Sequence, residues 1–242
     1  MSGHNKWSKI KKGKEVKDKQ KSSVFSKLAR LITLAVIEGR GITDPENNIK
    51  LRLAVEKARS LNFPKENIER AIEKGTGPAG QQLEEIIYEG FGPGGVALII
   101  LATTDNLNRS LGEVRHALEL YGGKLGNLGS VRYLFKKCGL AEFRLNEAQE
   151  KSVMEFSDKI GAFDLDEDED FFYIYFPYEN LGEVKEYTLD LKPTSVEVDY
   201  KPTAYVEVAN ENQAQKIREL IEALENLEDV HKVFTNATTL SK

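Results

Sequence analysis

The spacing of hydrophobic residues changes once along the chain, near residues 75–80, and this change limits the folds that the sequence can adopt. Before it, apolar residues recur about every 3.6 positions, the period of a helix that buries one face. After it, they alternate or form continuous β-branched runs, as in strands. The linking stretch, Gly75 to Gly80, is rich in glycine and has the composition of a flexible linker. The chain is therefore expected to begin with helices and to continue with sheets.

Three helices are predicted before the change of period. The first covers residues 22–37 and places these apolar residues on one face: Phe25, Leu28, Ala29, Ile32 and Val36. The second is predicted to begin at Asp44-Pro45, a capping residue followed by proline, and the third lies between Pro64 and Gly75. Short links between consecutive helices predict a small bundle over residues 22–78.

Strands and helices alternate in the rest of the chain. Strands are predicted near residues 86–90, 96–102, 131–136, 139–144, 162–165, 171–176, 194–200, 203–208 and 230–235. Helices are predicted near residues 109–121, 147–160, 178–188 and 211–226. Each of these helices lies between two predicted strands, which is typical of α/β units.

The order of these elements predicts one domain inserted into another. Residues 138–200 spell βαββαβ, the ferredoxin-like plan. Removing them leaves βαβ on each side, so residues 79–137 and 201–242 are expected to form a discontinuous α/β domain of similar plan. The predicted fold class is α+β: an N-terminal three-helix bundle followed by two ferredoxin-like α/β domains, the last inserted in the middle one.

Positive charge is concentrated in an amino-terminal arm, residues 1–21. The arm carries eight lysines, two acids and the sole tryptophan, Trp7. The first thirty residues have a balance of +8, whereas the whole chain sums to −5, so the remaining 212 residues carry −13. A polyanion is therefore expected to bind mainly to the arm, with lysines neutralising phosphates and Trp7 stacking on a base. The alternatives are a solvated tail and an indole that anchors the arm on the body.

A polar segment, residues 103–116, separates a buried strand from a helix. Ser110 and Glu113 have the spacing of a capping box. Arg109 and Arg115 are suited to phosphate near the positive end of a helix, with carboxylate pairing as the alternative for either. His116 lies two helical turns after Arg109, and Asp105 is a candidate to orient it, which leaves an enzyme as a weaker hypothesis.

Two other unusual stretches are explained better by turns than by ligand sites. Residues 122–130 are glycine-rich but lead from a helix to a strand, the reverse of a phosphate-binding loop, although Lys124 is placed to contact a nucleic-acid backbone. Residues 164–170 hold six acids in seven positions without the spacing of a calcium loop, so a solvated hairpin tip is expected.

Several classes of protein are excluded on composition. No apolar run approaches the roughly 20 residues of a membrane span. One cysteine, Cys138, and three histidines make a zinc site improbable, and no metal or other cofactor is expected. The single cysteine and an arm without an apolar signal region favour the cytoplasm.

Four motifs in order resemble the YebC/PmpR family over essentially the whole chain. They are Gly3 to Trp7 with the following lysines, Tyr88 to Val96, Asp105 to His116, and Gly122 to Gly126. The resemblance implies a helical bundle and two α/β domains, and a nucleic-acid-binding end that corresponds here to Lys6, Trp7, Lys9, Lys11, Lys12 and Lys14. Arg109, Arg115 and His116 resemble the family's polar α/β surface.

The resemblance implies either of two functions. We expect a non-enzymatic regulator of gene expression, a transcriptional regulatory protein that binds DNA through its basic N-terminal region. The alternative is a ribosome-associated translational activator that binds ribosomal or transfer RNA, and a third class is a protein-interaction adaptor. No motif for reading bases is present, so weak sequence specificity is predicted. The protein is expected to be a monomer.

Overall fold

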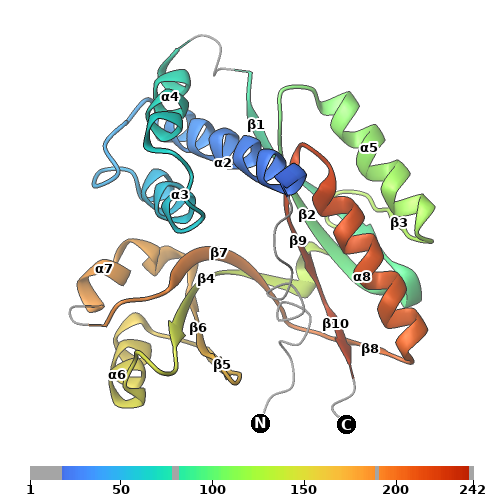
Figure 1. Ribbon diagram of the computed structural model, residues 1–242. Helices are drawn as coiled ribbons and strands as arrows, with labels where there is room; N and C mark the ends of the chain where they lie inside the picture. The colour runs from blue at the N-terminus through green and yellow to red at the C-terminus, as the bar shows by residue number, and fades with distance from the viewer. Residues whose placement is uncertain (1–17, 78–81, 189–190, 240–242) are drawn as a thin grey trace. The chain divides into compact units, whose positions relative to one another are not determined.

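The computed structural model describes residues 18–77, 82–188 and 191–239, which Figure 1 shows as coloured ribbons. Helices come first and sheets follow. Residues 136–201 form one compact unit, and the other described residues form a larger one. The predicted succession of N-terminal helices and sheet-containing domains is thus confirmed.

Helices α2 (Asp18–Glu38), α3 (Ile49–Ser60) and α4 (Lys65–Thr76) share one core in the larger unit. Each helix contributes residues spaced by three or four positions, so the helical period accounts for which side chains are buried. The core includes Leu28, Ile32 and Val36 of α2, Leu51 and Val55 of α3, and Ile68 and Ala71 of α4.

The start of α3 was predicted wrongly at Asp44-Pro45. Asp44 instead holds a turn, accepting a hydrogen bond from the amide of Glu46 at 3.0 Å. The helix begins after Asn48, whose buried side chain accepts from the Leu51 amide at 3.1 Å and donates to the Ala35 carbonyl at 2.8 Å. Asn48 bonds both helices at once, which fixes the corner between α2 and α3.

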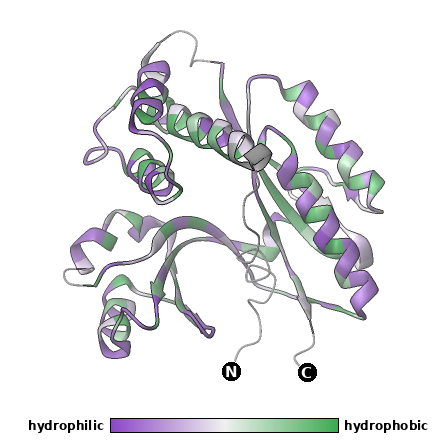
Figure 2. Cartoon of the chain, in the orientation of Figure 1, coloured by the Kyte–Doolittle hydropathy of each residue, from purple (hydrophilic) through white to green (hydrophobic). Residues whose placement is uncertain are grey.

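A four-stranded sheet follows in the larger unit, in the order β3-β1-β2-β9. The strands are β1 (Glu84–Phe91), β2 (Ala97–Thr104), β3 (Lys124–Leu125) and β9 (Val230–Thr235). Helices α5 (Leu107–Leu120) and α8 (Glu211–Asn226) pack on one face, against a cluster that includes Leu98, Ile100, Leu118 and Leu224. Figure 2 shows the continuous hydrophobic character of β2 and the mixed character of the two helices.

Two predicted strands of this domain differ from those in the structure. Residues 131–136 do not form a separate strand, because Arg132–Leu134 is a 3-10 turn that leads into one long strand, β4 (Phe135–Arg144). The strand predicted at 203–208 is reduced to β8 (Val206–Val208), which pairs in parallel with β10 (Ala237–Thr239) in a separate sheet. The place between β2 and β3 is taken by β1, which a short turn joins to β2.

The 136–201 unit contains a sheet in the order β5-β6-β4-β7. Its further elements are α6 (Glu150–Ile160), β5 (Asp164–Glu167), β6 (Phe171–Pro177), a 3-10 turn (Tyr178–Gly182), α7 (Val184–Tyr187) and β7 (Ser195–Pro202). The helix predicted at 178–188 is therefore a turn and a four-residue helix. Phe156 of α6 packs edge-on against Phe143 and Phe176 of the sheet, with ring centroids 5.1 and 6.4 Å apart.

The acidic run 164–170 is not simply a solvated hairpin tip. Asp166 is 4% exposed, and its Oδ2 atom lies 3.1 Å from the ammonium of Lys201, which is also 2.6 Å from Asp164. Asp168 holds the turn itself by accepting from the Phe171 amide at 2.8 Å. Asp164, Asp166 and Asp168 therefore have structural partners, which corrects the prediction.

Candidate nucleic-acid interface

The ten predicted contact residues fall into two groups. Those of the arm lie outside the described residues: Lys6, Trp7, Lys9, Lys11, Lys12 and Lys14. The structure describes the other four, of which Arg109, Arg115 and His116 lie on α5 and Lys124 lies on β3. The described part of the candidate interface is therefore the surface around α5 and the loop that follows it.

Helix α5 begins earlier than the capping-box spacing predicted. Asn106 has an extended backbone, and its side chain accepts from the Arg109 amide at 3.1 Å, which makes Asn106 the amino cap. Ser110 is 1% exposed and lies on the buried side of the helix. The capping box predicted for Ser110 and Glu113 is therefore wrong.

Arg109 is held by carboxylates. Its Nη2 atom lies 2.9 Å from Asp105 Oδ1 and 2.9 Å from Asp229 Oδ2. The hydrogen bonds with Asp229 and Asp105 raise the pKa of the guanidinium above its ordinary value. The structure shows the carboxylate pairing that was the alternative for Arg109. In the described ranges, Asp105 bonds to Arg109 and forms no hydrogen bond or ion pair with His116.

Asp229 joins three elements of the larger unit. Its side chain is 1% exposed and, besides Arg109, it contacts Arg30 of α2. The hydroxyl of Thr104, at the end of β2, donates to Asp229 Oδ2 at 2.8 Å. Arg30 also pairs with the exposed Glu228. This cluster of Asp229, Arg30, Arg109 and Thr104 links the helical bundle to the sheet, so its arginines serve the fold.

Arg115 and His116 are exposed on α5, outside the Asp229 cluster. Lys124 is also exposed, with its ammonium 5.4 Å from the centre of the Phe91 ring. All four described candidates are thus exposed, and Arg109 differs from the other three in being held by two carboxylates.

A buried carboxylate organises the loop that follows Lys124. Glu89 of β1 is 2% exposed, and its two oxygens accept from the amides of Gly129, Val131 and Arg132 at 2.7, 2.7 and 2.9 Å. Its carbonyl accepts from the Gly126 amide at 2.8 Å. Burial by itself raises the pKa of Glu89. The hydrogen bonds donated by the amides of Val131, Gly129 and Arg132 together have the larger effect, so the pKa is lowered. We call residues 126–133 the Glu89 loop.

The Glu89 loop presents large side chains to solvent. Leu128 is 84% exposed and Tyr133 is 74% exposed, although leucine is usually buried and tyrosine is often partly buried. Arg132 is exposed beside Tyr133. The loop is therefore a fixed surface with an aliphatic tip, an aromatic ring and a cation.

Sequence reasoning singled out Lys124 but missed Glu89, Leu128, Arg132 and Tyr133. One signal was present in the sequence. Residues 120–141 form the longest stretch of the chain without an acid, and they contain Lys124, Arg132, Lys136 and Lys137. In a chain with 39 acids, such a stretch indicates a surface that tolerates a polyanion.

Other reactive groups in the described ranges do not form a site. Cys138 is buried, and desolvation raises the pKa of its thiol to about 12. No group of three His, Cys, Asp or Glu side chains in these ranges is placed to hold a metal ion. None of the helices in them has the length and hydropathy to cross a membrane.

Comparison with known proteins gives consistent matches along the chain. Residues 5–78 match the TACO1/YebC protein N-terminal domain, and residues 83–237 match the TACO1/YebC second and third domain. A probable transcriptional regulatory protein of Aquifex aeolicus is 44% identical over 98% of this chain and 95% of its own length. A protein of the same description from Finegoldia magna is 42% identical over 98% of both chains.

A solved structure agrees with these matches. The crystal structure of a conserved hypothetical protein from Aquifex aeolicus superimposes with a TM-score of 0.86, at 42% sequence identity, and covers 96% of both chains. The predicted resemblance is confirmed: the chain belongs to the TACO1/YebC family.

Proposed function

We propose that this protein is a non-enzymatic nucleic-acid-binding regulator of gene expression, which binds DNA through its basic N-terminal region. The observation that carries the proposal is the segregation of charge, +8 in the first thirty residues against −13 in the rest. Counterion release from phosphates favours binding through such a segment. The relatives named probable transcriptional regulatory proteins support a nucleic-acid partner.

The acidic remainder of the chain supports a localised contact. The 136–201 unit contains 17 acids and 8 Lys or Arg residues, a balance of −9. Such a surface repels phosphates, so we place the nucleic acid on the arm and on the exposed side chains of Arg115, His116 and Lys124. We propose a cytoplasmic monomer that needs no cofactor. We also class this unit as ferredoxin-like, because β4 and β6 are central and its strand pairs β4–β6 and β5–β6 are antiparallel.

The alternative is a ribosome-associated translation factor that binds ribosomal or transfer RNA. The Glu89 loop favours it, because exposed aromatic and aliphatic side chains suit the unpaired bases of folded RNA. Crosslinking in cells, followed by sequencing of the bound nucleic acid, separates the two functions. Promoter DNA would support the first proposal, and ribosomal or transfer RNA would overturn it in favour of the second.

The arm is tested by replacing two lysines, Lys11→Gln and Lys12→Gln, in the full chain. If both contact phosphates, the log–log slope of duplex affinity against salt should fall by about 2, and affinity at physiological salt should fall about 30-fold. Fluorescence anisotropy with a labelled duplex between about 50 and 200 mM salt measures both quantities.

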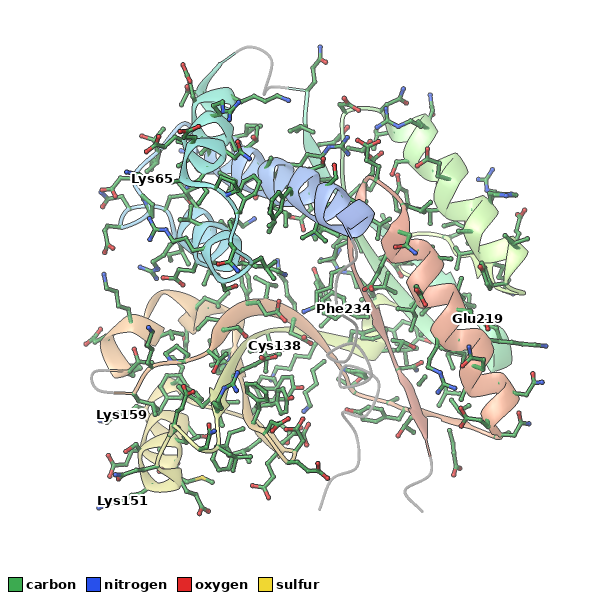
Figure 3. All side chains as sticks on the ribbon, in the orientation of Figure 1. Lys65, Cys138, Lys151, Lys159, Glu219 and Phe234 are labelled. Carbon is green, nitrogen blue, oxygen red and sulfur yellow. The ribbon has the colours of Figure 1, made fainter. Side chains whose placement is uncertain are left out.

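The matched control removes the same number of positive charges from the acidic 136–201 unit. Lys151→Gln and Lys159→Gln remove two exposed lysines of α6, labelled in Figure 3, and should leave affinity and slope unchanged. Equal behaviour of the two double variants would refute the arm as the binding segment.

The non-enzymatic proposal is tested at His116. Among the described residues, no carboxylate is hydrogen-bonded to His116, whereas an acid–base catalyst of this kind is oriented by such a bond. Full complementation of a deletion strain by a folded His116→Ala variant would rule out catalysis at this position. Loss of complementation by a variant with normal thermal stability and normal nucleic-acid affinity would favour catalysis at this position.

A further inference from the structure

We propose that the Glu89 loop is a binding site for unpaired nucleotides, with Tyr133 stacking on an exposed base and Lys124 and Arg132 contacting the adjoining phosphates. The inference rests on the proposed nucleic-acid binding and adds a second contact, of different selectivity, to the arm. It concerns residues 124–133, all of them described by the structure.

The first argument is that the loop is held in place before any ligand binds. Three amides donate to the carboxylate of Glu89, and a fourth donates to its carbonyl. Gly129 adopts a φ of +83°, a conformation that glycine takes without steric cost. A loop held by this many hydrogen bonds loses little conformational entropy when a ligand binds, as a preformed site requires.

The second argument is the position of the cations. The Gly126 amide and the Arg132 amide both bond to Glu89, so the two ends of the loop meet at this residue. Lys124 precedes one end, and Arg132 belongs to the other. The exposed Leu128 and Tyr133 therefore lie in a loop with a positive charge at each end.

Charge favours nucleic acid over a protein as the ligand. No acid occurs between Glu119 and Glu142, whereas this stretch has four Lys or Arg residues. An aromatic ring interleaved with cations matches a chain whose bases stack while its phosphates are neutralised. A purely apolar partner would leave these charges without a counterpart.

The form of the loop favours unpaired nucleotides over a duplex. Bases within a duplex are stacked on one another, so a single projecting ring reaches them only where the strand is open. A major groove is normally read by a helix or a two-stranded ribbon, whereas Tyr133 lies in a three-residue 3-10 turn. A bulge, a loop or a single strand is therefore the expected ligand.

Binding of two labelled probes by the full-length protein tests the proposal: a single-stranded oligoribonucleotide and a duplex of the same length. Tyr133→Ala should weaken binding of the single strand about tenfold, the order expected for one stacked base, and leave the duplex unchanged. Tyr133→Phe keeps the ring and should bind both probes as the parent protein does. Because Tyr133 is exposed, the parent protein and both variants should have the same melting temperature. A loss of affinity would then reflect a lost contact between Tyr133 and the nucleic acid.

The outcomes separate this inference from the proposed function. If the parent protein binds neither probe, the proposed function fails. If it binds both, and Tyr133→Ala binds the single strand normally, only the inference fails. Normal nucleic-acid binding by Tyr133→Ala, with lost complementation in cells, would overturn the inference in favour of a protein contact at the loop.

Discussion

Replacing Asp229 with alanine is expected to lower the free energy of unfolding by about 2–4 kcal/mol. The substitution leaves Arg30 and Arg109 without their shared carboxylate and deprives the Thr104 hydroxyl of its acceptor. Loss of one partner of a buried pair costs about 3–5 kcal/mol, but the arginines are 21% and 41% exposed and regain some hydration. Urea unfolding monitored by circular dichroism measures the change.

Glu228→Ala is the matched control, because Glu228 pairs with the same Arg30 but is 68% exposed. Exposed ion pairs contribute about 0–1 kcal/mol, so this variant should remain close to the parent protein. Adding Arg30→Ala to each variant isolates the coupling to α2. An Asp229→Ala effect no larger than that of Glu228→Ala would contradict a structural role for the cluster.

The Asp229 cluster also shows why the role of Arg109 was not predictable. The local sequence places Arg109 near a helix start, where phosphate binding and carboxylate pairing are equally reasonable. The deciding residue, Asp229, lies 120 positions away along the chain. Pairing over such a separation depends on the order of strands, and β9 beside β2 is a tertiary feature.

Local signals predicted most elements and failed where tertiary contacts supply the hydrogen bonds. Helices α4 and α8 and strands β2 and β6 follow their periodicity and turn residues closely. Residues 131–136 have the composition of a strand, but the carboxylate of Glu89 takes two of their amides, at Val131 and Arg132. A backbone amide bonded to a side chain is not available to a neighbouring strand.

The candidate site was predictable only in its charges. The lysines of the arm and Lys124 are visible as residue types, and so is the acid-free stretch 120–141. The exposure of Leu128 and Tyr133 is not, because apolar residues beside a predicted strand are normally assigned to a core. Their exposure follows from the bonds of Glu89 to residues 40 or more positions later.

Glu89→Gln should release this loop, and we expect a loss of about 2–3 kcal/mol in the free energy of unfolding at neutral pH. Glutamine keeps the size of the side chain but removes the charge, and it turns a donating NH2 group towards amides that are themselves donors. Bonds to a charged group contribute about 1.5–3 kcal/mol each, and the remaining amide oxygen still accepts, so the loss is partial. Hydrogen exchange at Gly129, Val131 and Arg132 should quicken, and Glu85→Gln, an exposed change on the same strand, should alter neither quantity.

The loss of stability caused by Glu89→Gln should become smaller as the pH falls. The pKa of Glu89 is lowered in the folded protein, so the carboxylate stabilises the fold above the ordinary glutamate pKa of about 4.3. As the pH falls through the lowered pKa, the parent protein loses this contribution, and the stabilities of parent and variant should converge. A difference that stays constant from neutral pH to below about 4 would show that packing, and not the charge, holds the loop. Because Tyr133 lies at the end of the same loop, Glu89→Gln should weaken single-strand binding while leaving the duplex affinity of the arm intact.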